Sequence, residues 1–252
     1  MDKQRFYIDT KGNDDEAYRE AMQFACKHAD NDTEIKKVIL LAASKKNTGW
    51  LDRLYGDKVV KQLFAGTTFK DCKPVFKIET TQTYRDSYTP SEIVISLGLG
   101  ADDLFKVDDY YSVKAIIAIP WLKQNTEKWV QTWSPTELRG NQSAVEGFPN
   151  PSCIVIKAME ELTESINMST GITHPIDERH AKTTILALHK YEPELNGDVV
   201  ASYLVREIGW DSGYANEMKE LINTLNAGKF FKGGDRTGLQ HSYKRWKEEC
   251  KP

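Results

Sequence analysis

The stretch Val38–Ala43 (VILLAA) is uninterrupted apolar sequence, and the polar stretch Ser44–Gly49 (SKKNTG) follows it directly. A continuous apolar run of this length is typical of a strand that is buried on both faces, as in the centre of a parallel sheet. Apolar residues then recur at helical spacing from about Trp50 to Phe64. Strand, polar break and helix in this order predict a βαβ unit.

The same pattern recurs through the first 140 residues. The other apolar, β-branched runs are Arg5–Asp9, Val75–Glu79, Glu92–Leu97 and Lys114–Pro120. Strands that alternate with helices predict a parallel sheet covered on both faces. We therefore expect residues 1–140 to form an α/β domain with a Rossmann-like, mostly parallel sheet of about five strands and flanking helices.

The pattern changes after Gly140. Residues 141–153 contain Gly147, Pro149 and Pro151, which favour a linker. Helical patterns dominate residues 154–252, so we expect an α-rich C-terminal domain. Gly233-Gly234 (residues 233–234) predicts a tight turn between two short strands, and this would give the domain winged-helix character.

Composition excludes several classes of protein. The chain of 252 residues has a formal net charge of −3, which gives no overall attraction to nucleic acid or to an anionic membrane. The four cysteines are widely spaced without a CxxC pair, so we expect no zinc site, and we expect reduced thiols in a cytoplasmic protein. The charged N-terminus and the absence of a long apolar run predict no signal segment and no membrane span. A homodimer is a reasonable expectation because symmetric dimers are common.

Polar residues follow most of the predicted strands, and these are the candidate ligand-binding residues. Because the carboxyl ends of parallel strands meet at one edge, open α/β sheets bind ligands there. The ligand-binding residues that we predict at this edge are Asp9, Thr10, Ser44, Lys45, Lys46, Thr48, Gly98, Gly100, Asp102 and Trp121.

These residue types suggest an anionic ligand. Two lysines among small polar residues before a helix can bind a phosphate, although the spacing matches neither a P-loop nor a GxGxxG fingerprint. Gly98 and Gly100 would allow a close approach, Asp102 could bind a ribose hydroxyl, and Trp121 could stack on a base. The alternative for each is structural, because loops and helix caps use the same residues.

Asp9 and Thr10 also invite comparison with two enzyme patterns. Haloacid-dehalogenase phosphotransferases need a second aspartate two residues after the first, and PIN-type nucleases need an asparagine there, whereas this chain has Lys11. Neither chemistry is supported. The histidines at 174 and 180 would not share a helical face, so we predict no metal site there.

The C-terminal residues give a weaker indication of DNA binding. Lys229, Lys232 and Arg236 flank the Gly-Gly turn, but the helix before it carries both Glu217 and Glu220. A recognition helix should present mainly basic or amide side chains.

Three hypotheses about function follow. The first is a protein that binds a phosphorylated or nucleotide-like small molecule at the carboxyl edge of the sheet. If it is an enzyme, its polar loops suit hydrolysis or transfer at a glycosidic or phosphate bond better than hydride transfer. The second is a ligand-sensing regulator with a DNA-binding winged helix, and the third is a protein-interaction scaffold without a ligand.

Overall fold

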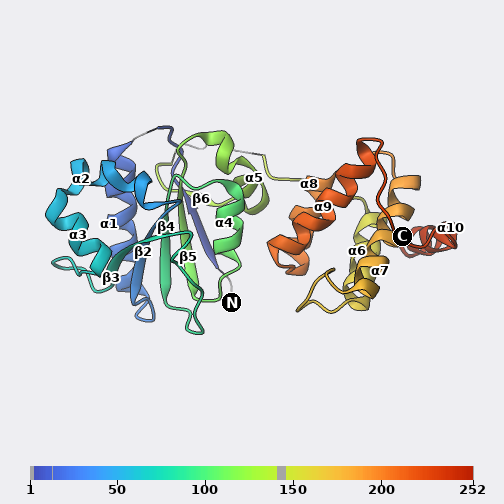
Figure 1. Cartoon of the computed structure of the whole chain (residues 1–252), viewed down its shortest axis with the longest axis horizontal. Coiled ribbons are helices and arrows are strands. Elements are labelled where there is room, and N and C mark those ends of the chain that lie inside the picture. The colour runs from blue at the N-terminus through green and yellow to red at the C-terminus, as the bar shows by residue number, and fades with distance from the viewer. Residues whose placement is uncertain (1–2, 13, 141–145, 252) are drawn as a thin grey trace. The chain divides into compact units, whose positions relative to one another are not determined.

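A computed structural model describes residues 3–12, 14–140 and 146–251. The chain forms two compact units, Met1–Gly147 and Phe148–Pro252 (Figure 1). The first unit holds a parallel sheet with helices on both faces, and the second is helical, which confirms the predicted fold class. No helix in these ranges is long and apolar enough to cross a membrane.

The sheet of the first unit has six parallel strands in the order β3-β2-β4-β5-β1-β6. The strands are β1 (Gln4–Tyr7), β2 (Lys37–Ala42), β3 (Val75–Thr80), β4 (Glu92–Leu97), β5 (Val113–Ile119) and β6 (Thr136–Glu137). The helices are α1 (Asp15–Asn31), α2 (Gly49–Tyr55), α3 (Asp57–Ala65), α4 (Ala101–Asp108) and α5 (Lys123–Trp133), and a 3₁₀ turn, η1 (Lys45–Thr48), precedes α2.

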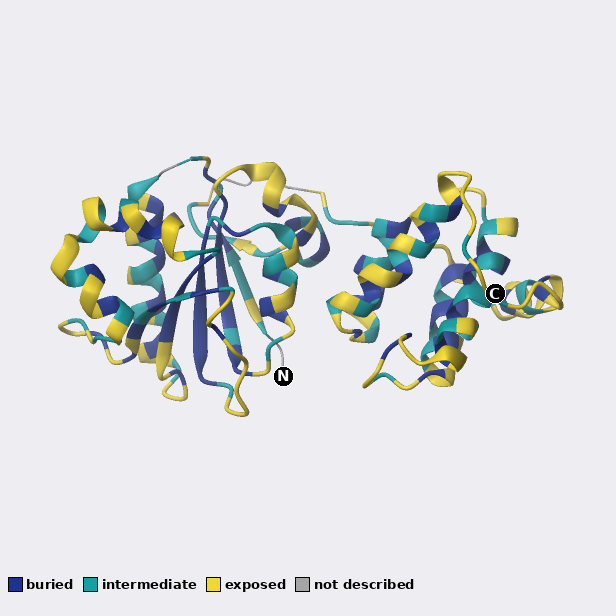
Figure 2. Ribbon diagram, viewed as in Figure 1, coloured by how far each residue is buried: buried dark blue, intermediate teal, exposed yellow. Residues whose placement is uncertain are grey.

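The central strands are apolar because both of their faces are covered (Figure 2). Along β2, Leu40 packs in the core that includes Tyr18 of α1 and Leu63 of α3. Its neighbour Leu41 packs in the opposite core, which includes Leu104 of α4 and Trp129 of α5. Each face therefore has its own helical layer, as the alternation of side chains along a strand requires.

Helices α1 and α5 lie on opposite faces of the sheet, and this arrangement leaves one position open at the carboxyl edge. The chain leaves β1 through α1 toward β2, and it leaves β5 through α5 toward β6, on the other side of β1. Because α1 and α5 cover opposite faces, the loops after β1 and β5 diverge. Neighbouring parallel strands with diverging loops form the crevice in which α/β sheets bind ligands.

The helix expected from about Trp50 to Phe64 is divided in two. Gly56 separates α2 from α3 with φ of +84°, a conformation that glycine adopts without steric cost. The helical spacing of the apolar residues therefore predicted the helical segments but not the break between them.

The second unit consists of helices joined by short loops. Its elements are α6 (Cys153–Ser165), α7 (Pro175–Tyr191), α8 (Gly197–Tyr203), the π-helical turn η2 (Leu204–Ile208), α9 (Ser212–Asn226) and α10 (Leu239–Glu249). Residues 230–238 contain no strand, so the expected wing is not formed. Gly233 and Gly234 do have positive φ, but a Cβ on Gly234 would meet Leu186 of α7 at 2.9 Å. The segment therefore packs on a helix instead of pairing with itself.

The expectation of reduced thiols was wrong. Cys26 is bonded to Cys72 in the first unit, and Cys153 is bonded to Cys250 in the second. The partners are 46 and 97 residues apart in the sequence, with Cα–Cα distances of 5.5 and 5.9 Å. Only the fold brings them together, which is why spacing along the chain did not indicate the pairing.

Candidate functional site

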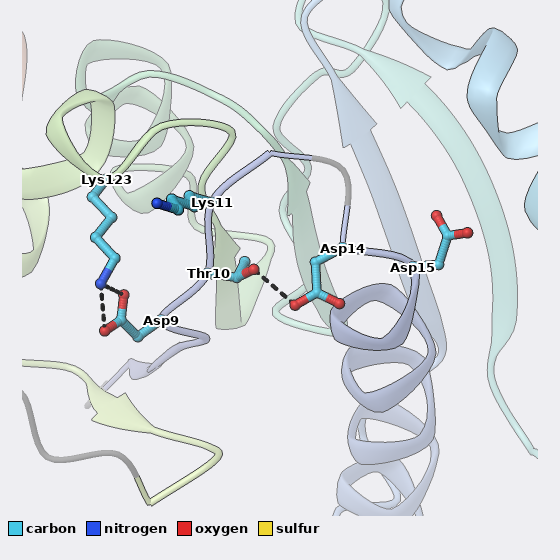
Figure 3. A pocket seen from close by; sticks show the side chains of 6 residues that line it. All are labelled: Asp9, Thr10, Lys11, Asp14, Asp15 and Lys123. Carbon is cyan, nitrogen blue, oxygen red and sulfur yellow. Dashed lines mark hydrogen bonds and ion pairs between the residues drawn. The ribbon is translucent and has the colours of Figure 1, made fainter.

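An open pocket of about 650 Å³ lies where the loops after β1 and β5 diverge. Figure 3 shows its lining side chains, which are Asp9, Thr10, Lys11, Asp14, Asp15 and Lys123. Five come from the β1–α1 connection and the start of α1, and Lys123 is the first residue of α5. The pocket therefore occupies the position at the sheet edge where the topology favours a ligand.

Asp9 and Lys123 form an ion pair across the crevice. The Lys123 ammonium lies 2.6 Å from one oxygen of the Asp9 carboxylate and 2.8 Å from the other. The Tyr7 hydroxyl donates to the same carboxylate at 3.2 Å, and burial together with the charge of Asp9 raises the pKa of Tyr7. The Asp9 side chain is 11% exposed, whereas that of Lys123 is 55% exposed, so the lysine is the partner that solvent and a ligand can reach.

Asp14 has a structural role at the same place. Its carboxylate accepts hydrogen bonds from the backbone N–H groups of Glu16 and Ala17, which caps α1. It also accepts from the Thr10 hydroxyl and from the Arg139 guanidinium, both at 2.7 Å. The hydrogen bond from Arg139 is the main reason that the pKa of Asp14 falls to about 2.

The other two lining residues differ in their pairing. The Asp15 carboxylate accepts two hydrogen bonds from Arg53, at 2.7 and 2.8 Å. Lys11 is exposed, and it has no ion-pair or hydrogen-bond partner among the described residues. Each carboxylate that lines the pocket is thus paired with a cation, although Arg139 also pairs with Glu20. The Lys11 ammonium is available to an incoming anion.

Replacing Asp14 with asparagine is expected to lower the free energy of unfolding of the first unit by about 1–2 kcal/mol at neutral pH. Asparagine caps a helix as well as aspartate does, so the variant isolates the charge that pairs with Arg139. Because the pKa of Asp14 lies below its usual value of 3.8, this stabilisation is complete above about pH 4. It should be lost as the pH falls toward about 2.

Urea denaturation of both proteins at neutral and at acidic pH checks this expectation. The difference between wild type and Asp14→Asn should shrink at the lower pH. Asp57→Asn removes an exposed ion pair with Lys61 and serves as the control, with little effect at either pH. A loss of stability in Asp14→Asn that does not change with pH would contradict the role given to the ion pair.

Two other predicted residues, Gly98 and Trp121, lie in the loops after β4 and β5, and Trp121 contacts the loop after β1. The Gly12 N–H donates to the Trp121 carbonyl at 2.6 Å, and the Gly98 N–H donates to the Ile119 carbonyl at 2.9 Å. A Cβ on Gly98 would lie 3.2 Å from the Trp121 Cβ, so the loops after β4 and β5 are in close contact. The Trp121 side chain is 40% exposed. Gly100 and Asp102 are at the start of α4, where Gly100 is the N-cap residue.

The polar run after β2 does not line the pocket. In the sheet order β4 and β5 separate β2 from β1, so three strand spacings, about 14 Å, separate this run from Asp9. The Thr48 hydroxyl donates to the Lys45 carbonyl at 2.7 Å, and the Lys45 ammonium lies 5.7 Å from the ring centroid of Phe64. Ser44 makes no side-chain cap to the turn, and Lys46 is exposed. The anion-binding role of this run stays a prediction.

Lys11, Asp14, Asp15 and Lys123 were not among the predicted ligand-binding residues. Lys123 follows β5 as Asp9 follows β1, and this shared position after a strand was the available signal. The pairing of each carboxylate with a cation cannot be read from the sequence, because Arg53 and Arg139 are remote along the chain. Within the described ranges, no three His, Cys, Asp or Glu side chains cluster as a metal site would need.

A comparison with models of protein families finds a match within the second unit. Residues 151–247 match the model of a domain of unknown function, DUF1889. No curated protein matches the chain. No solved structure matches it.

Proposed function

We propose that the first unit binds a phosphorylated or nucleotide-like small molecule in the pocket between β1 and β5. The observation that carries the proposal is an open pocket at this crevice in which Lys11 is a cation with no partner in the part of the chain that the structure describes. A phosphate group would provide an anionic partner for the Lys11 ammonium. Thr10 and Asp9 supply the hydroxyl and carboxylate oxygens that bind the polar groups of a sugar.

The ion pair between Asp9 and Lys123 suits a site that changes on binding. A phosphate in the pocket competes with Asp9 for the exposed Lys123 ammonium. Release of Lys123 would leave the Asp9 carboxylate free to accept a hydrogen bond from a ligand hydroxyl. If the protein is an enzyme, this carboxylate is our candidate for the acid–base group in hydrolysis or transfer at a glycosidic or phosphate bond.

Thermal denaturation with a panel of compounds tests the proposal. The panel contains nucleotides, sugar phosphates, the corresponding nucleosides and sugars, and inorganic phosphate. A phosphorylated compound at 100 times its Kd should stabilise the folded protein by about 2.7 kcal/mol and raise the Tm of the first unit by about 5–10 °C. Its counterpart without phosphate should have a much smaller effect.

The location of binding is tested by two variants. At the same compound concentration, Lys11→Ala should reduce the shift to about half or less if the ligand lies between β1 and β5, whereas Lys45→Ala with Lys46→Ala should leave it intact. The opposite result would place the anion after β2 and overturn the proposed site. A flat response across the panel would favour the scaffold hypothesis.

A further inference from the structure

The loop of residues 227–238 in the second unit, which we name the aromatic–basic loop, presents one aromatic and three cationic side chains. Phe230 is 79% exposed, unusually high for such a large apolar side chain. Lys229, Lys232 and Arg236 are exposed, and none has a side-chain ion pair or hydrogen bond among the described residues. The acidic residue of the loop, Asp235, accepts two hydrogen bonds from Thr237 within the loop itself.

Contacts with α7 fix the loop in place. The Asp235 N–H donates to the Thr183 hydroxyl at 2.7 Å, and the Lys182 ammonium donates to the Lys232 carbonyl at 2.8 Å. The Lys182 ammonium also lies 5.7 Å from the ring centroid of Phe231, and Gly234 packs closely against Leu186. Phe230 is therefore exposed on an anchored segment, and its position requires little ordering when a partner binds.

We propose that the aromatic–basic loop binds single-stranded nucleic acid. Proteins that bind single strands without sequence preference combine cations along the backbone with aromatic rings on which bases stack. Lys229, Lys232 and Arg236 supply the cations, and Phe230 supplies the ring. This inference is independent of the pocket between β1 and β5, because it uses other residues in the other unit.

A single strand fits this loop better than a duplex. Stacking on Phe230 needs a base whose face is uncovered, and base pairs in a duplex already cover each other. The loop has no strands to form a wing, and α9 carries Glu217 and Glu220, which a helix in the major groove would bring close to phosphates. A membrane surface fits less well, because an interfacial segment needs a broad apolar face and Phe230 is the one large apolar side chain of this loop that is exposed.

Fluorescence anisotropy of a labelled single-stranded oligonucleotide of 20 thymidines tests the proposal with the full-length chain. Phe230→Ala should weaken binding by about 5- to 150-fold, the range found when one base loses its aromatic partner. Lys229→Ala with Lys232→Ala should reduce the slope of log K against log salt by about 1.4. The duplex of the same length should bind more weakly than the single strand.

Matched variants distinguish this site from general charge attraction. Ile176→Ala removes another exposed apolar side chain of the second unit, and Lys58→Ala with Lys106→Ala removes two exposed lysines from the first. Both should bind the oligonucleotide like wild type. The proposal is overturned if Phe230→Ala binds normally, if the control variants lose as much affinity, or if only anionic phospholipid vesicles bind the loop.

Discussion

Replacing Asp108 with alanine is expected to lower the free energy of unfolding of the first unit by about 3–5 kcal/mol, a large share of the stability of an ordinary domain. Asp108 is the last residue of α4, and its side chain is 2% exposed. Its carboxylate accepts from the Arg5 Nε at 2.9 and 3.1 Å and from the Trp129 indole at 2.9 Å. One buried carboxylate thus joins the first strand to two helices.

The expected loss of stability is large because the alanine variant would leave buried polar groups without partners. The Arg5 side chain is 16% exposed, and it would lose its anionic partner in a place where water cannot fully replace it. Trp129 is fully buried, so its indole N–H would lose its acceptor without access to solvent. Removing one partner of a buried charged network costs far more than the net stabilisation that the network provides.

Two measurements check the Asp108 prediction. Chemical denaturation gives the loss of stability, and hydrogen exchange of the native proteins shows which unit is affected. Exchange should speed up in the peptides of the first unit while the second unit is unchanged, because the two units have separate cores. Asp102→Ala is the control, since Asp102 is exposed in the first turn of the same helix and contributes only a small interaction with the helix dipole. Equal effects of the two variants would contradict the network's role.

Replacing both Cys153 and Cys250 with serine is expected to destabilise the second unit by about 4–5 kcal/mol. The bond joins residues 97 apart, from the first residue of α6 to the residue after α10. In the chain-entropy model, a crosslink that closes a loop of about 100 residues restricts the unfolded chain by this amount. Nearly the whole second unit lies inside that loop.

The folded second unit keeps other contacts that hold α10 against α6 and the end of α7. The Trp246 indole of α10 donates to Glu161 of α6 at 2.7 Å, and the Tyr243 hydroxyl donates to Glu192 at 2.9 Å. The double serine variant should therefore remain folded but unfold at lower denaturant. Hydrogen exchange in α6 and α10 should speed up, whereas Cys26→Ser with Cys72→Ser should affect only the first unit. Unchanged exchange in α6 and α10 would contradict the expectation.

The sequence predicted the strands well where burial dictates composition. The boundaries of β4 were predicted correctly and those of β2 to within one residue, because a strand covered on both faces must be apolar throughout. The short edge strand β6, Thr136–Glu137, has no such signature and was missed. The position of β1 between β5 and β6 depends on contacts between residues more than 100 positions apart, which no local pattern encodes.

In the candidate site too, local sequence predicted some residues, and others depend on contacts between distant parts of the chain. Asp9 and Thr10 were predicted because they follow a strand, and both line the pocket. Lys11 and Lys123 were not predicted as ligand-binding residues. Their roles depend on which carboxylates form ion pairs and which cation has no partner among the described residues, and only the fold determines this pairing. Lys45 was predicted from its neighbours in the sequence, but the strand order places it away from Asp9. The position of a residue after a strand thus predicted that it lies at the carboxyl edge of the sheet. Which of these residues lie close together depends on the strand order, which only the folded structure shows.

Isothermal titration calorimetry with the phosphorylated compound that most stabilises the protein tests the central claim most directly. Wild type and the control Lys58→Ala should bind it with the same Kd, and Lys11→Ala should bind at least about 10-fold more weakly, since a charged hydrogen bond contributes about 1.5–3 kcal/mol. The same Kd in all three proteins would contradict the proposed site between β1 and β5.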